Sequence, residues 1–163
     1  NPSLENKEAV AHAVGVGAVI FHDLKNDRTN NFDFALEEVV QFEGETGPYV
    51  QYTHARAMSI LRKANHTVDT QAAFSLTDDD AWEVLKLIEN YPNVVRFAEE
   101  KCEPSAIAKF VINLAQAFNK YYAHTKVLVE DEAFNSRIAL VQTTASILKQ
   151  GLALLGVAAP DEM

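Results

Sequence analysis

Residues 46–56 read Thr46-Gly47-Pro48-Tyr49-Val50-Gln51-Tyr52-Thr53-His54-Ala55-Arg56. Proline is tolerated in the first turn of a helix, so Gly47-Pro48 predicts that a helix begins here. On that helix Tyr49, Tyr52 and Arg56 fall at i, i+3 and i+7, which places them on one face. Two rings and a planar cation can stack on unpaired bases and hold a phosphate. From spacing alone we favour a simpler interpretation, a stripe that packs against another helix.

The rest of the chain shows helical periodicity and no convincing strand. The spacing of apolar residues predicts helices over residues 7–24, 35–42, 47–64, 77–90, 92–97, 104–122 and 134–155. We expect Leu36, Val39 and Val40 on the buried side of the second helix. The predicted fold is all-α, a helical bundle preceded by a short and mostly helical piece.

Some expectations concern single helices. Thr77 is expected to cap the helix that Asp78-Asp79-Asp80 opens, and Trp82 is expected in its apolar stripe. Pro92 is expected to begin a new helix. Gly156 is a natural terminator of the last helix.

Composition indicates one soluble globular unit. The chain has 163 residues, of which 48% are hydrophobic and 23% charged. A single cysteine, Cys102, rules out an internal disulfide framework and suits a reducing compartment, so we expect a cytoplasmic protein. No apolar run approaches the roughly 20 residues of a membrane span, and no membrane partner is expected.

The net charge of −9 argues at first against a nucleic-acid partner. The charge is unevenly distributed, however. His54, Arg56, Arg62 and Lys63 lie in a stretch that contains no acid between Tyr49 and Asn65. Global acidity therefore does not exclude a local face that binds phosphate.

The sequence contains no convincing catalytic constellation. Gly15-Val16-Gly17 lacks the third glycine and the lysine of a phosphate-binding loop, and the five histidines are dispersed. Tyr121 and Tyr122 end the long predicted helix. Tyr121 extends its apolar stripe and is expected in the core, whereas Tyr122 points elsewhere. Spacing alone gives Met163 no role.

Several segments together resemble arginyl-tRNA synthetase, and the resemblance covers essentially the whole chain. They are Thr46–Arg56, Val14–Val19, Arg28–Asn30, Ser136–Leu140, Leu148–Val157 and Ala159–Met163. The resemblance implies a C-terminal piece of a class I synthetase. Residues 1–47 would be the end of the catalytic region and its junction. Residues 48–163 would be the helical anticodon-binding domain named for an Asp-Ala-Leu-Arg motif, of which only Arg137 is recognisable.

The resemblance also implies partners and chemistry. The parent would ligate arginine to its tRNA with ATP and magnesium, whereas the nucleotide-binding signatures are missing here and would precede Asn1. This piece would hold no cofactor and would be inactive alone. Its partners would be the anticodon loop of the arginine tRNA and the remaining catalytic domain, not DNA.

The site follows from the resemblance by position. The residues similar to those that face the tRNA are Tyr49, Tyr52, Arg56, Tyr121 or Tyr122, and Met163. The alternative hypothesis is a helical domain whose aromatic face docks another protein and which has no RNA partner.

Overall fold

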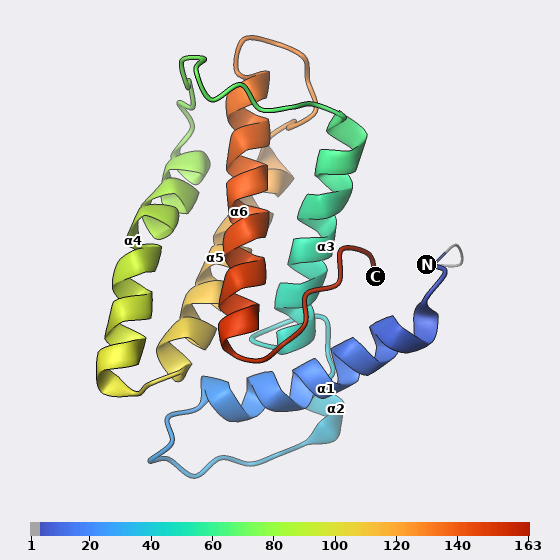
Figure 1. The fold of residues 1–163 in the computed structure, drawn as a ribbon, viewed down its shortest axis with the longest axis vertical. Helices are drawn as coiled ribbons and strands as arrows, with labels where there is room; N and C mark the ends of the chain where they lie inside the picture. Colours follow the sequence, from blue (N-terminus) through green and yellow to red (C-terminus); the bar gives the residue numbers. More distant parts are fainter. Residues whose placement is uncertain (1–3) are drawn as a thin grey trace.

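The structure is a computed structural model that describes residues 4–163. The described part contains six α-helices and no strand, which confirms the all-α prediction (Figure 1). The helices are α1 (Lys7–Lys25), α2 (Leu36–Val39), α3 (Gly47–Ala64), α4 (Asp79–Lys101), α5 (Ser105–His124) and α6 (Phe134–Leu154).

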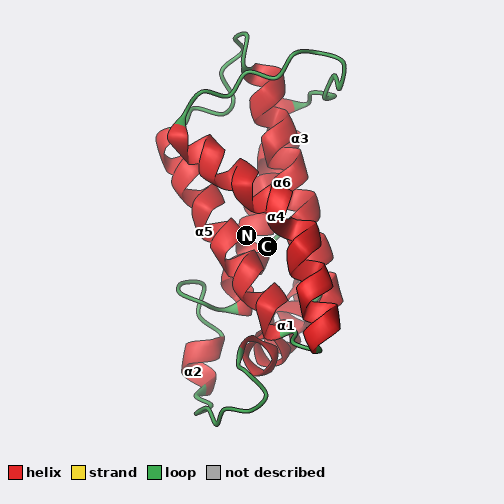
Figure 2. Ribbon diagram, turned by 90° about the vertical axis from the view of Figure 1, so that its left-hand side faces the viewer, coloured by secondary structure: helices red, strands yellow, loops and turns green. Residues whose placement is uncertain are grey.

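Helices α3, α4, α5 and α6 run along the long axis and form the bundle (Figure 1). The core side chains come from their facing stripes, and Phe118, Leu114, Ile138 and Leu148 are fully buried. Helices α1 and α2 lie at one end of the bundle, and the long loops after α3 and α5 lie at the other (Figure 2). After α6, residues 157–163, here the C-terminal segment, turn back along α3 (Figure 1).

Helix α3 begins and ends where its sequence predicts. The Thr46 hydroxyl accepts a hydrogen bond from the Tyr49 N–H at 3.2 Å, and Pro48 occupies the first turn. At the other end Asn65 adopts a left-handed conformation with φ 43° and stops the helix.

Close packing between α1 and α3 explains why glycine occupies positions 17 and 47. A Cβ at Gly17 would lie 2.8 Å from the Gln51 amide nitrogen, and one at Gly47 would lie 2.8 Å from the Cβ of Phe21. The absence of these side chains lets α1 cross directly against the start of α3. Gly15 has open space around it and plays no such part.

Helix α4 differs from expectation. It runs through Pro92 without a break, because residues on both sides, such as Ile88 and Val94, pack against the core and offset the cost of an interior proline. Its cap is Asp78 and not Thr77, since the Asp78 carboxylate accepts from the Ala81 N–H at 2.7 Å.

Two apolar expectations were also wrong. Trp82 is 60% exposed, because it lines an open hollow between α4 and α6 and is not packed in the core. The predicted helix over 35–42 shrinks to α2, in which Val39 is buried while Leu36 and Val40 are exposed. A single helical turn can present only one residue to the core. No helix among residues 4–163 is long and apolar enough to cross a membrane.

Candidate nucleic-acid interface

A cavity of about 230 Å³ opens on the outer face of α3, between the end of α5 and the C-terminal segment. We call it the α3 pocket. It is lined by Tyr52, Ala55, Arg56, Ser59, Ile60, Arg62, Lys63, Tyr122, Glu162 and Met163. Four of the predicted site residues are thus brought together from three separate segments: Tyr52, Arg56, Tyr122 and Met163.

The Arg56 guanidinium lies near two aromatic rings. Its central carbon lies 5.0 Å from the centre of the Tyr52 ring and 5.9 Å from that of Tyr122. Both distances fall in the range of a cation–π contact. Tyr52 comes one helical turn before Arg56 on α3, whereas Tyr122 reaches the same place from the end of α5. Tyr52 and Tyr122 remain 42% and 39% exposed, although Tyr122 also stacks on Phe118 and Tyr52 meets Phe42 in a T-shaped contact.

Asn119 of α5 fixes the position of Arg56. Its Oδ1 accepts a hydrogen bond from Arg56 Nη1 at 2.7 Å. Its Nδ2 lies 3.0 Å from the Tyr49 hydroxyl and 2.9 Å from the Thr53 hydroxyl and donates to both. Tyr49 therefore belongs to the network that supports Arg56 and does not line the α3 pocket.

A second groove of about 690 Å³ continues from the α3 pocket, because Arg56 and Tyr122 line both. Its far side is formed by Lys126 and residues 127–129 in the loop after α5. Leu128 is 42% exposed there. The groove thus adds one cation and an apolar wall to the α3 pocket.

Arg137 holds that loop in place from inside the bundle. It is only 7% exposed, and its Nε donates to the Val127 carbonyl at 3.2 Å. Its Nη2 donates to the Val129 carbonyl and to the Asp131 carboxylate. The guanidinium holds the pKa of Asp131 below its usual value. Arg137 therefore shapes the groove without facing it.

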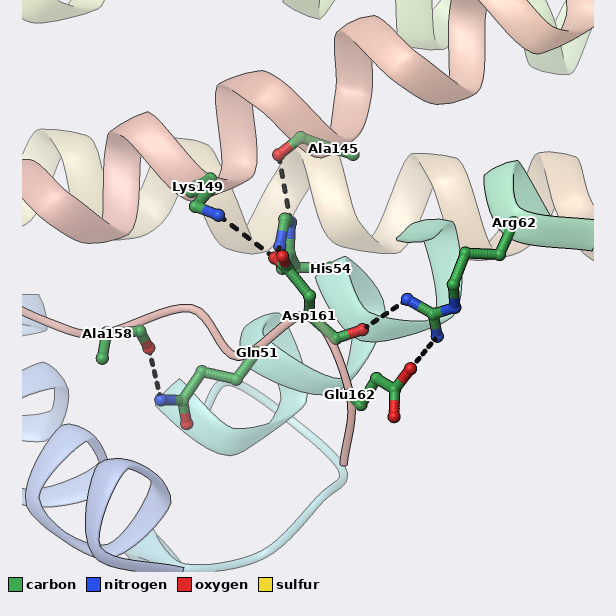
Figure 3. A network of polar contacts seen from close by, with 8 residues as sticks. All are labelled: Gln51, His54, Arg62, Ala145, Lys149, Ala158, Asp161 and Glu162. Carbon is green, nitrogen blue, oxygen red and sulfur yellow. Dashed lines mark hydrogen bonds and ion pairs between the residues drawn. The ribbon is translucent and has the colours of Figure 1, made fainter. Parts of the chain in front are cut away.

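The C-terminal segment carries Met163 to the α3 pocket along a series of polar contacts (Figure 3). Gln51 donates to the Ala158 carbonyl at 2.7 Å. Arg62 donates to the Asp161 carbonyl at 3.2 Å and pairs with the Glu162 carboxylate at 3.4 Å. These contacts place a half-buried Met163 beside the rings and cations of α3.

The charge around the pocket is positive although the chain is acidic. Arg56 and Lys63 have no carboxylate within ion-pair distance among residues 4–163, whereas Arg62 is paired with Glu162. Three cations therefore line the pocket with one carboxylate, that of Glu162, which is paired with Arg62. Such a surface attracts an anion.

Tyr121 lies elsewhere. Its side chain is fully buried in the bundle, and burial raises the pKa of its phenol to about 12. Of the two neighbouring tyrosines, Tyr122 is the one whose ring lines the α3 pocket. The periodicity of α5 correctly placed Tyr121 in the core.

Sequence reasoning missed Asn119 altogether. A lone asparagine in a helix gives no periodic signal, and its three partners lie 63–70 residues away in sequence. Across the described residues, no three His, Cys, Asp or Glu side chains gather in a way that could hold a metal ion.

A helical bundle with exposed rings and free cations around one pocket has the features of a nucleic-acid-binding module. The family follows from comparison with known domains. The chain belongs to the DALR anticodon binding domain family, whose model matches residues 50–163. The resemblance read from the sequence is thereby confirmed.

Similar proteins and structures are arginyl-tRNA synthetases. The arginine–tRNA ligase of Enterococcus faecalis is 65% identical over 163 residues, which are all of this chain and 29% of that protein. That of Streptococcus thermophilus is 59% identical with the same coverage.

Among solved structures, the Thermus thermophilus arginyl-tRNA synthetase superposes with a TM-score of 0.90 at 36% identity. The match covers 100% of this chain and 29% of that one. The Plasmodium falciparum enzyme gives 0.90 at 25% identity, covering 98% of this chain and 29% of that one. The chain thus spans 29% of the length of each of these relatives.

Proposed function

We propose that the α3 pocket and its adjoining groove bind the anticodon loop of an arginine-accepting tRNA. The observation that carries this proposal is the arrangement of Arg56, a cation held over Tyr52 and beside Tyr122 with no carboxylate partner among the described residues. An ordinary helix–helix contact would bury these rings. Here they stay open to solvent beside an unneutralised charge.

The geometry suits a loop whose bases are splayed apart. An unpaired base can stack on Tyr52 or Tyr122, and stacking on an aromatic ring is worth about 1–3 kcal/mol per base. The guanidinium uses one nitrogen on Asn119, which leaves its other donors for a phosphate. Met163 adds an apolar surface against a base edge or face. Affinity then comes from one local surface and does not require a basic protein.

The role of the whole protein follows from its relatives. We propose that the chain is the anticodon-binding portion of a cytoplasmic arginine–tRNA ligase, which joins arginine to tRNA with ATP and magnesium. Residues 1–47 would end the catalytic region, and the start of the family match at residue 50 supports that boundary. Residues 1–3 of this part lie outside the described residues. We assign no residue of the chain a role toward ATP or magnesium, and expect no aminoacylation by it alone.

The test compares three RNAs at low salt, because phosphate contacts weaken as salt rises. Fluorescence anisotropy would measure binding to arginine tRNA, to the same tRNA with a changed anticodon, and to an unrelated tRNA. We expect the first to bind more tightly than the other two. Equal or absent binding of all three would contradict the proposal and favour a protein-docking role for the aromatic face.

The variant Tyr52→Ala tests whether RNA binds at the α3 pocket. Tyr52→Ala removes a ring that is 42% exposed, so the bundle should keep its helix content by circular dichroism while RNA binding weakens. If helix content falls with binding, Tyr52 is structural and its assignment to the interface is wrong.

A further inference from the structure

His54 is a buried histidine whose two ring nitrogens both face acceptors. It lies on α3 and is only 1% exposed. Its Nδ1 is 3.1 Å from the Ala145 carbonyl oxygen of α6, and its Nε2 is 3.0 Å from Asp161 Oδ1 in the C-terminal segment (Figure 3). The same ring therefore links α3, α6 and the C-terminal segment.

The chemistry of the two partners determines which ring nitrogens of His54 carry a proton. A carbonyl oxygen can only accept, so Nδ1 must carry a proton. An ionised carboxylate also only accepts, so Nε2 must carry one as well. The His54 hydrogen bond, followed by that of Lys149, holds the pKa of Asp161 below its usual value, which keeps the carboxylate ionised near neutral pH. The docked segment thus retains a proton between His54 and Asp161.

The other charges at this place are on the surface. Lys149 of α6 pairs with Asp161 Oδ1 at 3.1 Å, but its side chain is 56% exposed. Arg62 of α3 contacts the Asp161 carbonyl and Glu162, and its side chain is 46% exposed. Exposed pairs of this kind contribute little stability. Among the contacts of the Asp161 carboxylate, the one with His54 is made to a buried group.

We propose that His54 and Asp161 are positioning residues, which dock the C-terminal segment on α3 through a shared proton and so place Met163 in the α3 pocket. Asp161 stands two residues before Met163, so release of its carboxylate frees the end that lines the pocket. The effect on RNA rests on the proposed function, whereas the docking itself does not.

Methionine methyl NMR measures docking directly, because the chain has two methionines, Met58 and Met163. Met58 packs against the core and serves as an internal reference. In Asp161→Asn we expect the Met163 methyl signal to move to the position of a disordered methionine while that of Met58 stays. An unchanged Met163 signal in the variant would overturn the proposal.

RNA binding is the second measurement, and an anticodon stem–loop is the probe. Asp161→Asn should bind roughly tenfold more weakly, in line with the loss of one partly exposed charge-assisted hydrogen bond. Glu89→Gln, an equal charge change at an exposed site on α4, is the matched control.

The two proposals fail in different ways. If the wild type binds no RNA but Asp161→Asn shifts the Met163 signal as expected, the proposed function is wrong and the docking stands. If RNA binds and Asp161→Asn binds it as tightly as the wild type does, the positioning role is wrong.

Discussion

Replacing Arg56 with alanine tests the proposed interface most directly. The structure places its guanidinium 5.0 Å from the Tyr52 ring centre, 2.7 Å from Asn119 Oδ1, and without a carboxylate partner among the described residues. Because no internal ion pair is lost, the variant removes a cation that is free to meet RNA. The loss of protein stability should be about 1–2 kcal/mol, from one hydrogen bond and the cation–π contact with Tyr52.

The expected loss of binding follows from the same geometry. A hydrogen bond to a charged group contributes about 1.5–3 kcal/mol, and a half-buried site open to solvent belongs at the lower end. About 1.5 kcal/mol corresponds to a roughly tenfold rise in Kd. If Arg56 contacts one phosphate, the slope of log Kd against log salt should also shrink by about 0.7–0.9.

The assay is fluorescence anisotropy with a labelled anticodon stem–loop over a series of salt concentrations. Lys86→Ala is the control, since it removes one positive charge from an exposed position on α4, outside the α3 pocket and its adjoining groove. We expect Arg56→Ala to change both the affinity and the salt slope, and Lys86→Ala to change neither. Equal effects of the two variants would show that only net charge matters, and would refute the reasoning from the pocket.

Two further predictions concern the bundle. Gly151→Ala should lower the free energy of unfolding by about 1–3 kcal/mol in urea titrations, because a Cβ there would overlap Val111. Gly15→Ala should raise the free energy of unfolding by about 0.5–1 kcal/mol, because Gly15 has open space around it. Equal effects would contradict the close packing of α5 on α6. Burial raises the pKa of Tyr121 to about 12, so the folded state keeps a proton that the unfolded chain loses near pH 10, and stability should fall as the pH rises through this range. Between about pH 9 and about pH 11 the wild type should lose about 1 kcal/mol more than Tyr121→Phe, and identical pH profiles would disprove that assignment.

Most of the bundle could be predicted because a helix repeats its apolar positions. The stripe from Ile107 through Phe118 to Tyr121 is buried as its spacing indicates, and Gly156 ends the C-terminal turn with φ +73°. The predictions that proved wrong lie where tertiary packing overrides a local sequence preference. A proline normally starts a helix, but Pro92 sits where turns on both sides pack on the core, and the helix continues.

The site could be predicted only in part, for a related reason. Periodicity tells which residues share a face, so it placed Tyr52 and Arg56 together on α3. It does not tell what packs against that face. Asn119 orients Arg56 from 63 residues away, and Asp161 meets His54 from 107 residues away. Neither has a signal of its own in the sequence.

The α3 pocket depends on the fold as a whole, because its walls come from α3, the end of α5 and the C-terminal segment. Arg56 alone on an isolated helix would be one exposed cation in a chain of net charge −9. In the bundle, a hydrogen bond to Asn119 and two flanking rings restrict it, so the proposed binding group would be ordered before RNA arrives. Ordering a side chain on binding costs about 0.5–1.5 kcal/mol, and prior ordering avoids that cost. An acidic domain can therefore hold a polyanion, provided that its few free cations are fixed by the fold.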